Sequence, residues 1–243
     1  MSKNNPFEME VWLKDDKVIM HGDDRVGINA IYGSDNDLVT NWGKGPDRIF
    51  RDGSCQVSSA VWCYYALTGH EEKDPRVQNE AALQKMVKRQ AAEINNIYWQ
   101  SWPSRAMRDI LGWLGLEGED LDGTLDGPTK WNMGNEGFHD GDMLNIIWQH
   151  SQSVNGKPVY LMWGSGHMVA LSIKTPTDLY WYDNQASLVK CESLEALKNW
   201  VRWSGTNNGE FQGKKPWACI QCKTTGVNEI DFDVAKAFVN NSV

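Results

Sequence analysis

Three nearly continuous apolar runs in the second half of the chain place the strongest constraint on its fold. They read PVYLMW over 158–163, HMVALSI over 167–173 and DLYWYD over 178–183, and turn-forming residues separate them. Strands that are covered on both faces have this composition, because neither face meets water. The runs predict consecutive buried strands of an antiparallel sheet, and a further strand is predicted over 216–223.

Helical periodicity dominates the part of the chain before these runs. Between residues 57 and 67, apolar side chains recur on one helical face, which predicts a helix that begins at Ser54 or Cys55 and ends near Gly69. Other helices are predicted over 76–97, after Pro103, over 139–152, over 194–203 and near 232–241. Helices first and antiparallel strands afterwards are typical of the α+β class.

The N-terminal part of the chain has a different character. Short strands around the polar turn Asp15-Asp16 are predicted within 8–32, and loops are predicted over 33–54 and over the acidic stretch 115–138. We therefore divide the chain of 243 residues into a β-rich segment of unknown role, 1–50, and a main domain, 51–243.

Charge and hydropathy narrow the classes of partner. The net charge of −8 argues against a nucleic acid and against an anionic membrane surface, because both require a basic face. No apolar run approaches the roughly 20 residues of a membrane span. The N-terminus lacks the apolar core of a Sec signal peptide. The odd count of five cysteines predicts no disulfide framework and a reducing compartment at synthesis.

Cys55 is the first of three candidate catalytic residues. It follows Gly53 and Ser54 at the predicted helix start, where the positive end of the helix dipole favours the reactive thiolate. Free backbone N–H groups at a helix start can also hold a developing oxyanion. The alternative is a small buried side chain without a chemical role.

His167 and Asp183 complete the candidate site. His167 opens a buried strand, and the next strand ends at Asp183. If the two strands form a hairpin, the carboxylate lies against the imidazole, where it can fix the tautomer and stabilise the charged ring. The alternatives are a histidine that caps a strand and a turn formed by Asp183 and the residues after it, and Asn184 is a second candidate for the third position.

The segments GSCQVSSAVWCYYAL, GHMVALSI and LYWYDNQ resemble the catalytic motifs of papain-like cysteine peptidases. They are most similar to the YopT/AvrPphB type of bacterial effector protease. Cys55, His167 and Asp183 match that family's triad, and Trp62 matches a Trp after its Cys. The resemblance implies a papain-like fold, with the nucleophile helix packed on the C-terminal sheet, and amide hydrolysis through a thioester.

The resemblance also implies a biological setting. A protein of this family would be made without a signal peptide and exported by a secretion system. It would act on a protein substrate in a target cell as an effector or toxin. A secretion chaperone or a cognate immunity protein would be a further partner. The same triad also serves glutamine deamidases, transglutaminases and peptidoglycan amidases, and a binding module without activity is the remaining alternative.

For the oxyanion hole and the substrate cleft around the triad, the sequence offers several candidate residues. The stretch RIFRDGS before Cys55 holds no Gln or Asn, so Gln56, Asn41 or backbone N–H groups are the candidates for the oxyanion hole. Apolar and small residues near the triad in sequence are candidates for a substrate cleft: Trp163, Gly166 and Trp181.

We expect neither a metal nor a cofactor. Cys219 and Cys222 form a CxxC, but residues three apart in a strand point to opposite faces, and the chain has no second CxxC. The acidic stretch 117–126 lacks the spacing of a calcium-binding EF-hand loop.

Overall fold

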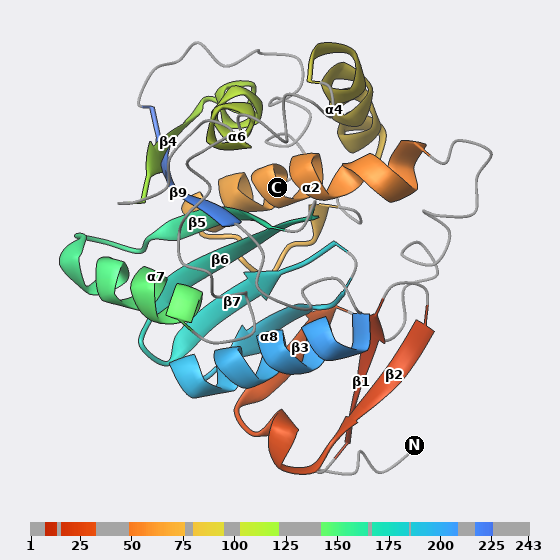
Figure 1. The fold of residues 1–243 in the computed structure, drawn as a ribbon, viewed down its shortest axis with the longest axis vertical. Helices are drawn as coiled ribbons and strands as arrows, with labels where there is room; N and C mark the ends of the chain where they lie inside the picture. Colours follow the sequence, from red (N-terminus) through yellow and green to blue (C-terminus); the bar gives the residue numbers. More distant parts are fainter. Residues whose placement is uncertain are drawn as a thin grey trace.

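A seven-stranded antiparallel sheet forms the centre of the protein (Figure 1). The computed structural model describes residues 8–13, 16–32, 49–75, 80–94, 103–121, 142–164, 167–184, 186–208 and 217–225. Within these ranges the strand order is β3-β8-β7-β6-β5-β9-β4. The strands span β3 (Ile28–Tyr32), β4 (Leu116–Asp120), β5 (Val159–Gly164), β6 (His167–Thr175), β7 (Asp178–Tyr182), β8 (Leu188–Cys191) and β9 (Trp217–Thr224).

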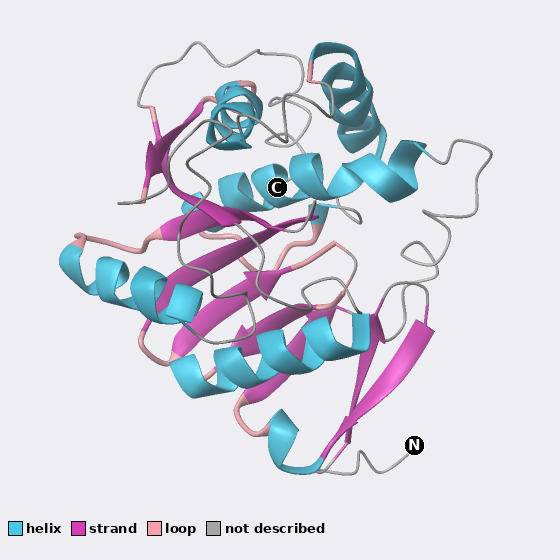
Figure 2. Cartoon of the chain, in the orientation of Figure 1, coloured by secondary structure: helices cyan, strands magenta, loops and turns pink. Residues whose placement is uncertain are grey.

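Helices cover both faces of this sheet, which gives three layers (Figure 2). One face packs against α2 (Ile49–Leu67), α4 (Glu80–Glu93) and α6 (Pro103–Gly112). The other face packs against α7 (Asp142–Ser153) and α8 (Leu194–Asn208), which lie across the near side of the sheet in Figure 1. The described residues thus form an α+β fold, as the sequence predicts.

Side chains of the central strands alternate between the two helical layers. In β5, Leu161 lies in the layer of α2 and Met162 in the layer of α7 and α8. The same alternation separates Tyr182 from Trp181 in β7, and all four side chains are buried. The apolar runs therefore belong to strands that are covered on both faces, and this prediction is confirmed.

The N-terminal segment contributes to the main sheet. β1 (Glu8–Leu13) and β2 (Asp16–His21) form a separate two-stranded ribbon, followed by a short 3-10 helix, η1 (Gly22–Arg25). β3 then pairs antiparallel with β8, with Ile28 opposite Cys191. The sequence did not predict β8, because a four-residue strand leaves too short a pattern to recognise.

Two predictions about loops are wrong. The nucleophile helix begins at Ile49, so residues 49–54 are helical and Cys55 lies in its second turn. Gly53 costs a helix interior only about 1 kcal/mol, which packing of the helix can outweigh. Residues 116–120 form β4, an edge strand on β9, whose exposed acidic side chains resemble a loop in sequence.

The other helices match their predictions where the structure describes them, and the helix predicted over 232–241 lies outside the described residues. None of the described helices is long and apolar enough to span a membrane.

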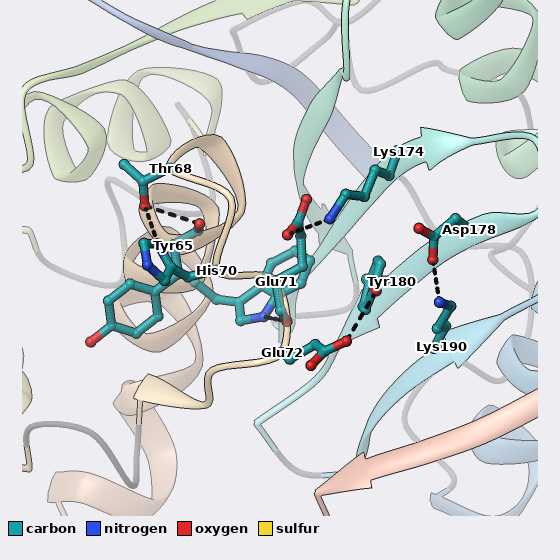
Figure 3. Close-up of polar contacts among 10 residues, drawn as sticks. Tyr65, Thr68, His70, Glu71, Glu72, Lys174, Asp178, Tyr180 and Lys190 are labelled. Atoms are coloured by element: carbon teal, nitrogen blue, oxygen red, sulfur yellow. Dashed lines mark hydrogen bonds and ion pairs between the residues drawn. The ribbon is translucent and has the colours of Figure 1, made fainter. Parts of the chain in front are cut away.

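A polar network holds the loop after α2 against the β6–β7 hairpin (Figure 3). Nζ of Lys174 lies 3.2 Å from Oε2 of Glu71, a buried carboxylate in that loop. Nζ of Lys190 lies 2.7 Å from Oδ1 of Asp178. Both ammonium groups also lie over the ring of Tyr180, 5.9 Å and 5.5 Å from its centroid. The contact between Lys174 and Glu71 ties the loop after α2 to the end of β6 away from its first residue.

Candidate active site

The start of β6 and the end of β7 bring His167 and Asp183 together. β6 and β7 pair antiparallel, with Ala170 opposite Tyr182, so the first residue of one strand lies near the residue that follows the other. The Nε2–H of His167 donates to Oδ1 of Asp183 at 2.7 Å, and both side chains are buried. The predicted contact between this imidazole and this carboxylate is confirmed.

Cys55 approaches the same imidazole from helix α2. Its side chain hydrogen-bonds to the His167 ring, whose Nε2 is already bound to Asp183, so Nδ1 is left for the thiol. Cys55 is 5% exposed and His167 3% exposed. The three side chains thus form a continuous chain from sulfur through imidazole to carboxylate.

Two contacts set the position of α2 on the sheet. The Ser59 hydroxyl donates to the carbonyl oxygen of Met168 at 3.1 Å, one turn of helix after Cys55. The Trp62 ring stacks on the Tyr182 ring, with centroids 5.7 Å apart and planes 8° apart. The residues of β6 and β7 next to His167 and Asp183 therefore also hold the helix that carries the thiol. Sequence reasoning missed Ser59, whose signal is its spacing of four residues from Cys55.

Electrostatics favour the charged form of the imidazole. Burial alone would lower the pKa of His167, but the Asp183 carboxylate and the hydrogen bonds to Asp183 and Cys55 outweigh it. The pKa of His167 is held well above its ordinary value near 6.5. A protonated imidazole beside the sulfur stabilises a thiolate, the reactive form of cysteine.

The raised pKa of His167 predicts a pH dependence of stability. Between its ordinary and its raised pKa, the folded chain binds a proton that the unfolded chain lacks. The contribution of His167 is therefore complete below about pH 6.5 and is lost as the pH rises through the raised value.

Urea unfolding between pH 6.5 and 8.5 checks this expectation in the Cys55→Ala background, where the thiol makes no contribution. The comparison chain is Cys55→Ala/His167→Gln/Asp183→Asn, which has no ionisable pair, and the stability advantage of the chain that keeps His167 and Asp183 should shrink by about 1 kcal/mol per pH unit. An advantage that stays constant or grows with pH would contradict the raised pKa.

The other four cysteines are also buried, and none of them forms a disulfide. Burial raises the pKa of Cys63, Cys191 and Cys219, which keeps these thiols protonated and poorly reactive. Cys222 packs in the layer of α2 and Cys219 in the layer of α7 and α8, so the CxxC pair points to opposite faces as predicted. The described residues contain no cluster of three ligands that could hold a metal.

Two of the other predicted site residues lie beside the triad, and two lie outside the described residues. Gln56 is buried next to Cys55, and its Oε1 has no hydrogen-bond partner in the described part of the chain. Asn184 is half-buried directly after Asp183. Asn41 and Gly166 lie outside the described residues.

The two predicted cleft tryptophans lie on opposite faces of the sheet. Trp163 packs in the layer of α2, and its neighbour in β5, Gly164, pairs with His167. Trp181 is 1% exposed in the layer of α7 and α8. The expectation that Trp181 lines the cleft is wrong, because strand alternation turns it into the core on the face away from α2.

The helix start at Ile49 bears on which groups could hold an oxyanion near Cys55. Only the first four N–H groups of a helix are free, and Cys55 is the seventh residue of α2. Its backbone N–H is therefore used within the helix, and the expectation that Cys55 lies at the helix start, among the free N–H groups, is wrong. An oxyanion at this site would need donors other than the backbone N–H of Cys55.

Comparison with protein-family models and with curated proteins found no match to this chain.

Proposed function

We propose that the protein is a thiol hydrolase with a Cys55-His167-Asp183 triad. The observation that carries the proposal is the buried contact chain in which His167 hydrogen-bonds to both Cys55 and Asp183. A thiol, an imidazole and a carboxylate in this order form an activated nucleophile, its proton partner and the group that orients that partner. A purely structural histidine would need only one of these contacts.

The triad supports acyl transfer by a thioester route. The Cys55 thiolate attacks the substrate carbonyl, and the imidazolium of His167 protonates the leaving amine as the C–N bond breaks. Neutral His167 then takes a proton from water, whose oxygen attacks the thioester and releases the acid and the thiolate. Asp183 holds Nε2 throughout, so that Nδ1 faces the reacting atoms.

Gln56 is our candidate for the oxyanion donor. It adjoins the nucleophile, it is 7% exposed, and its Oε1 accepts no hydrogen bond from the described residues. A buried acceptor without a partner costs about 1–3 kcal/mol, which a substrate N–H that donates to this Oε1 would recover. The amide nitrogen would donate to the oxyanion, in the place of the backbone N–H groups that the sequence first suggested.

The resemblance to papain-like peptidases supports cleavage of a protein substrate. Helix α2 packs on the antiparallel sheet and carries the thiol, which is the arrangement that the resemblance implies. On this proposal the protein is an effector or toxin that a secretion system delivers into a target cell. A secretion chaperone or immunity protein would bind it before delivery.

A non-catalytic binding module is the second candidate, and the burial of Cys55 favours it. A nucleophile that is 5% exposed offers little surface to a substrate. However, a binding module has no need of an imidazole that bridges a thiol and a buried carboxylate. The two candidates therefore differ in the reactivity of the sulfur rather than in its exposure.

Mass spectrometry of target-cell lysate tests the proposed reaction and its substrate. Lysate is treated with the wild-type protein or with the Cys55→Ala variant, and peptides are compared. New N-termini that depend on Cys55 indicate proteolysis, and conversion of glutamine to glutamate indicates deamidation by the same triad. Identical peptide profiles in both lysates would contradict the hydrolase proposal and favour the binding module.

A further inference from the structure

Ser59 connects helix α2 to the second residue of β6 through a side-chain hydrogen bond. Its Oγ donates to the Met168 carbonyl oxygen at 3.1 Å, and both residues are fully buried. Met168 directly follows His167. The pairing of β6 with β7 extends only as far as Ala170 and Tyr182, so Met168 lies beyond the end of that ladder.

The spacing along α2 connects this bond to the proposed nucleophile. Residues four apart on a helix share a face and have Cβ atoms about 5–6 Å apart. Cys55 and Ser59 therefore face the first two residues of β6 side by side. The bond from Ser59 to Met168 fixes the rotation of α2 and its height above the strand, and both determine the distance from the Cys55 sulfur to the His167 ring.

We propose that Ser59 is a positioning residue that holds the Cys55 thiol in hydrogen-bonding register with His167. This inference rests on the proposed function and deepens it, since it names the contact that sets the thiol–imidazole geometry. Without the Ser59 hydroxyl, the helix keeps its apolar contacts but loses its hydrogen bond to the residue that follows His167. A displacement of about 1 Å at a reacting pair can cost about a hundredfold in rate.

The pH profile of Cys55 alkylation tests the inference. Iodoacetamide reacts with the thiolate, and an imidazolium partner keeps that form present at mildly acidic pH. For the wild-type protein we expect fast alkylation of Cys55 at pH 5.5. For Ser59→Ala we expect Cys55 to be alkylated about ten to a hundred times more slowly at pH 5.5. The pH dependence of its alkylation rate should move toward that of an ordinary thiol.

Three further variants separate positioning from a loss of stability. Ser204 is a buried serine of α8 whose hydroxyl bonds to Val201 in its own helix, and Ser204→Ala should leave the Cys55 profile unchanged. Ser59→Thr and Ser59→Val have side chains of similar shape, but only threonine keeps a hydroxyl donor. Cys55 should therefore be alkylated faster at pH 5.5 in Ser59→Thr than in Ser59→Val, and this comparison holds even if Ser59→Ala does not fold.

The outcomes distinguish this inference from the proposed function. A wild-type protein without fast alkylation at pH 5.5 refutes the thiol–imidazole pair, and the role of Ser59 falls with it. If Cys55 is alkylated rapidly at pH 5.5 in the wild-type protein and equally rapidly in a folded Ser59→Ala variant, the positioning role alone is refuted. Equal profiles for Ser59→Thr and Ser59→Val, or an equal loss in Ser204→Ala, would also overturn it.

Discussion

The His167→Ala variant is expected to lose about 3–5 kcal/mol of its free energy of unfolding at neutral pH. The substitution leaves the Asp183 carboxylate, which is 1% exposed, without its imidazole partner. A buried carboxylate that loses its imidazole must either remain charged in a poorer environment or take up a proton, and both cost free energy. Urea unfolding followed by circular dichroism measures the loss.

Asp183→Asn, which changes the other member of the pair, is the matched control. Asparagine keeps the shape and can still accept the Nε2–H of His167, while the imidazole can become neutral by releasing its proton. We expect a loss of about 1–2 kcal/mol, clearly smaller than that of His167→Ala. The doubly substituted His167→Ala/Asp183→Asn chain should be more stable than the sum of the two losses predicts. Equal losses in both single variants would contradict an ionic His167–Asp183 pair.

Cys55→Ala is expected to lower kcat/KM by about four to six orders of magnitude while the chain stays folded. The sulfur is the attacking atom of the proposed reaction, and alanine offers no nucleophile in its place. The change removes a single buried heavy atom, so the expected cost in stability is about 1 kcal/mol. The rate is measured on a peptide that spans the Cys55-dependent cleavage or deamidation point found in lysate.

Cys63→Ala is the control for this loss of activity. Cys63 lies on the same helix two turns later, is fully buried, and donates from its sulfur to the Tyr160 carbonyl oxygen at 3.8 Å. Its removal should cost stability but leave the activity of the folded protein within a few-fold of the wild type. Activity retained in purified Cys55→Ala would contradict the assignment of the nucleophile.

Much of the fold follows from local pattern. The apolar runs over 158–163, 167–173 and 178–183 correspond to β5, β6 and β7, because strands covered on both faces show an uninterrupted pattern. Elements that tertiary contacts stabilise were not predictable in this way. The acidic edge strand β4 and the four-residue strand β8 gain their hydrogen bonds from partners distant in sequence.

The candidate site was predictable where chain connectivity determines the geometry. A tight hairpin forces Asp183 toward His167, so their contact could be deduced from two strand ends. The environment of Cys55 could not be deduced, because the start of α2 depends on packing that overrides the local signal of Gly53 and Ser54. The cross-layer bond from Ser59 to Met168 likewise depends on how the helix docks on the sheet.

The alkylation rate of Cys55 at pH 5.5, compared with the rates of the other four cysteines in the same folded sample, tests the central claim most directly. Peptide mapping after a timed exposure to iodoacetamide gives all five rates. Cys55 should react at least about ten times faster than any other cysteine, because an imidazolium beside it favours the thiolate at a pH where an ordinary thiol is almost fully protonated. Slow modification of Cys55, at a rate like that of the four core thiols, would contradict the triad.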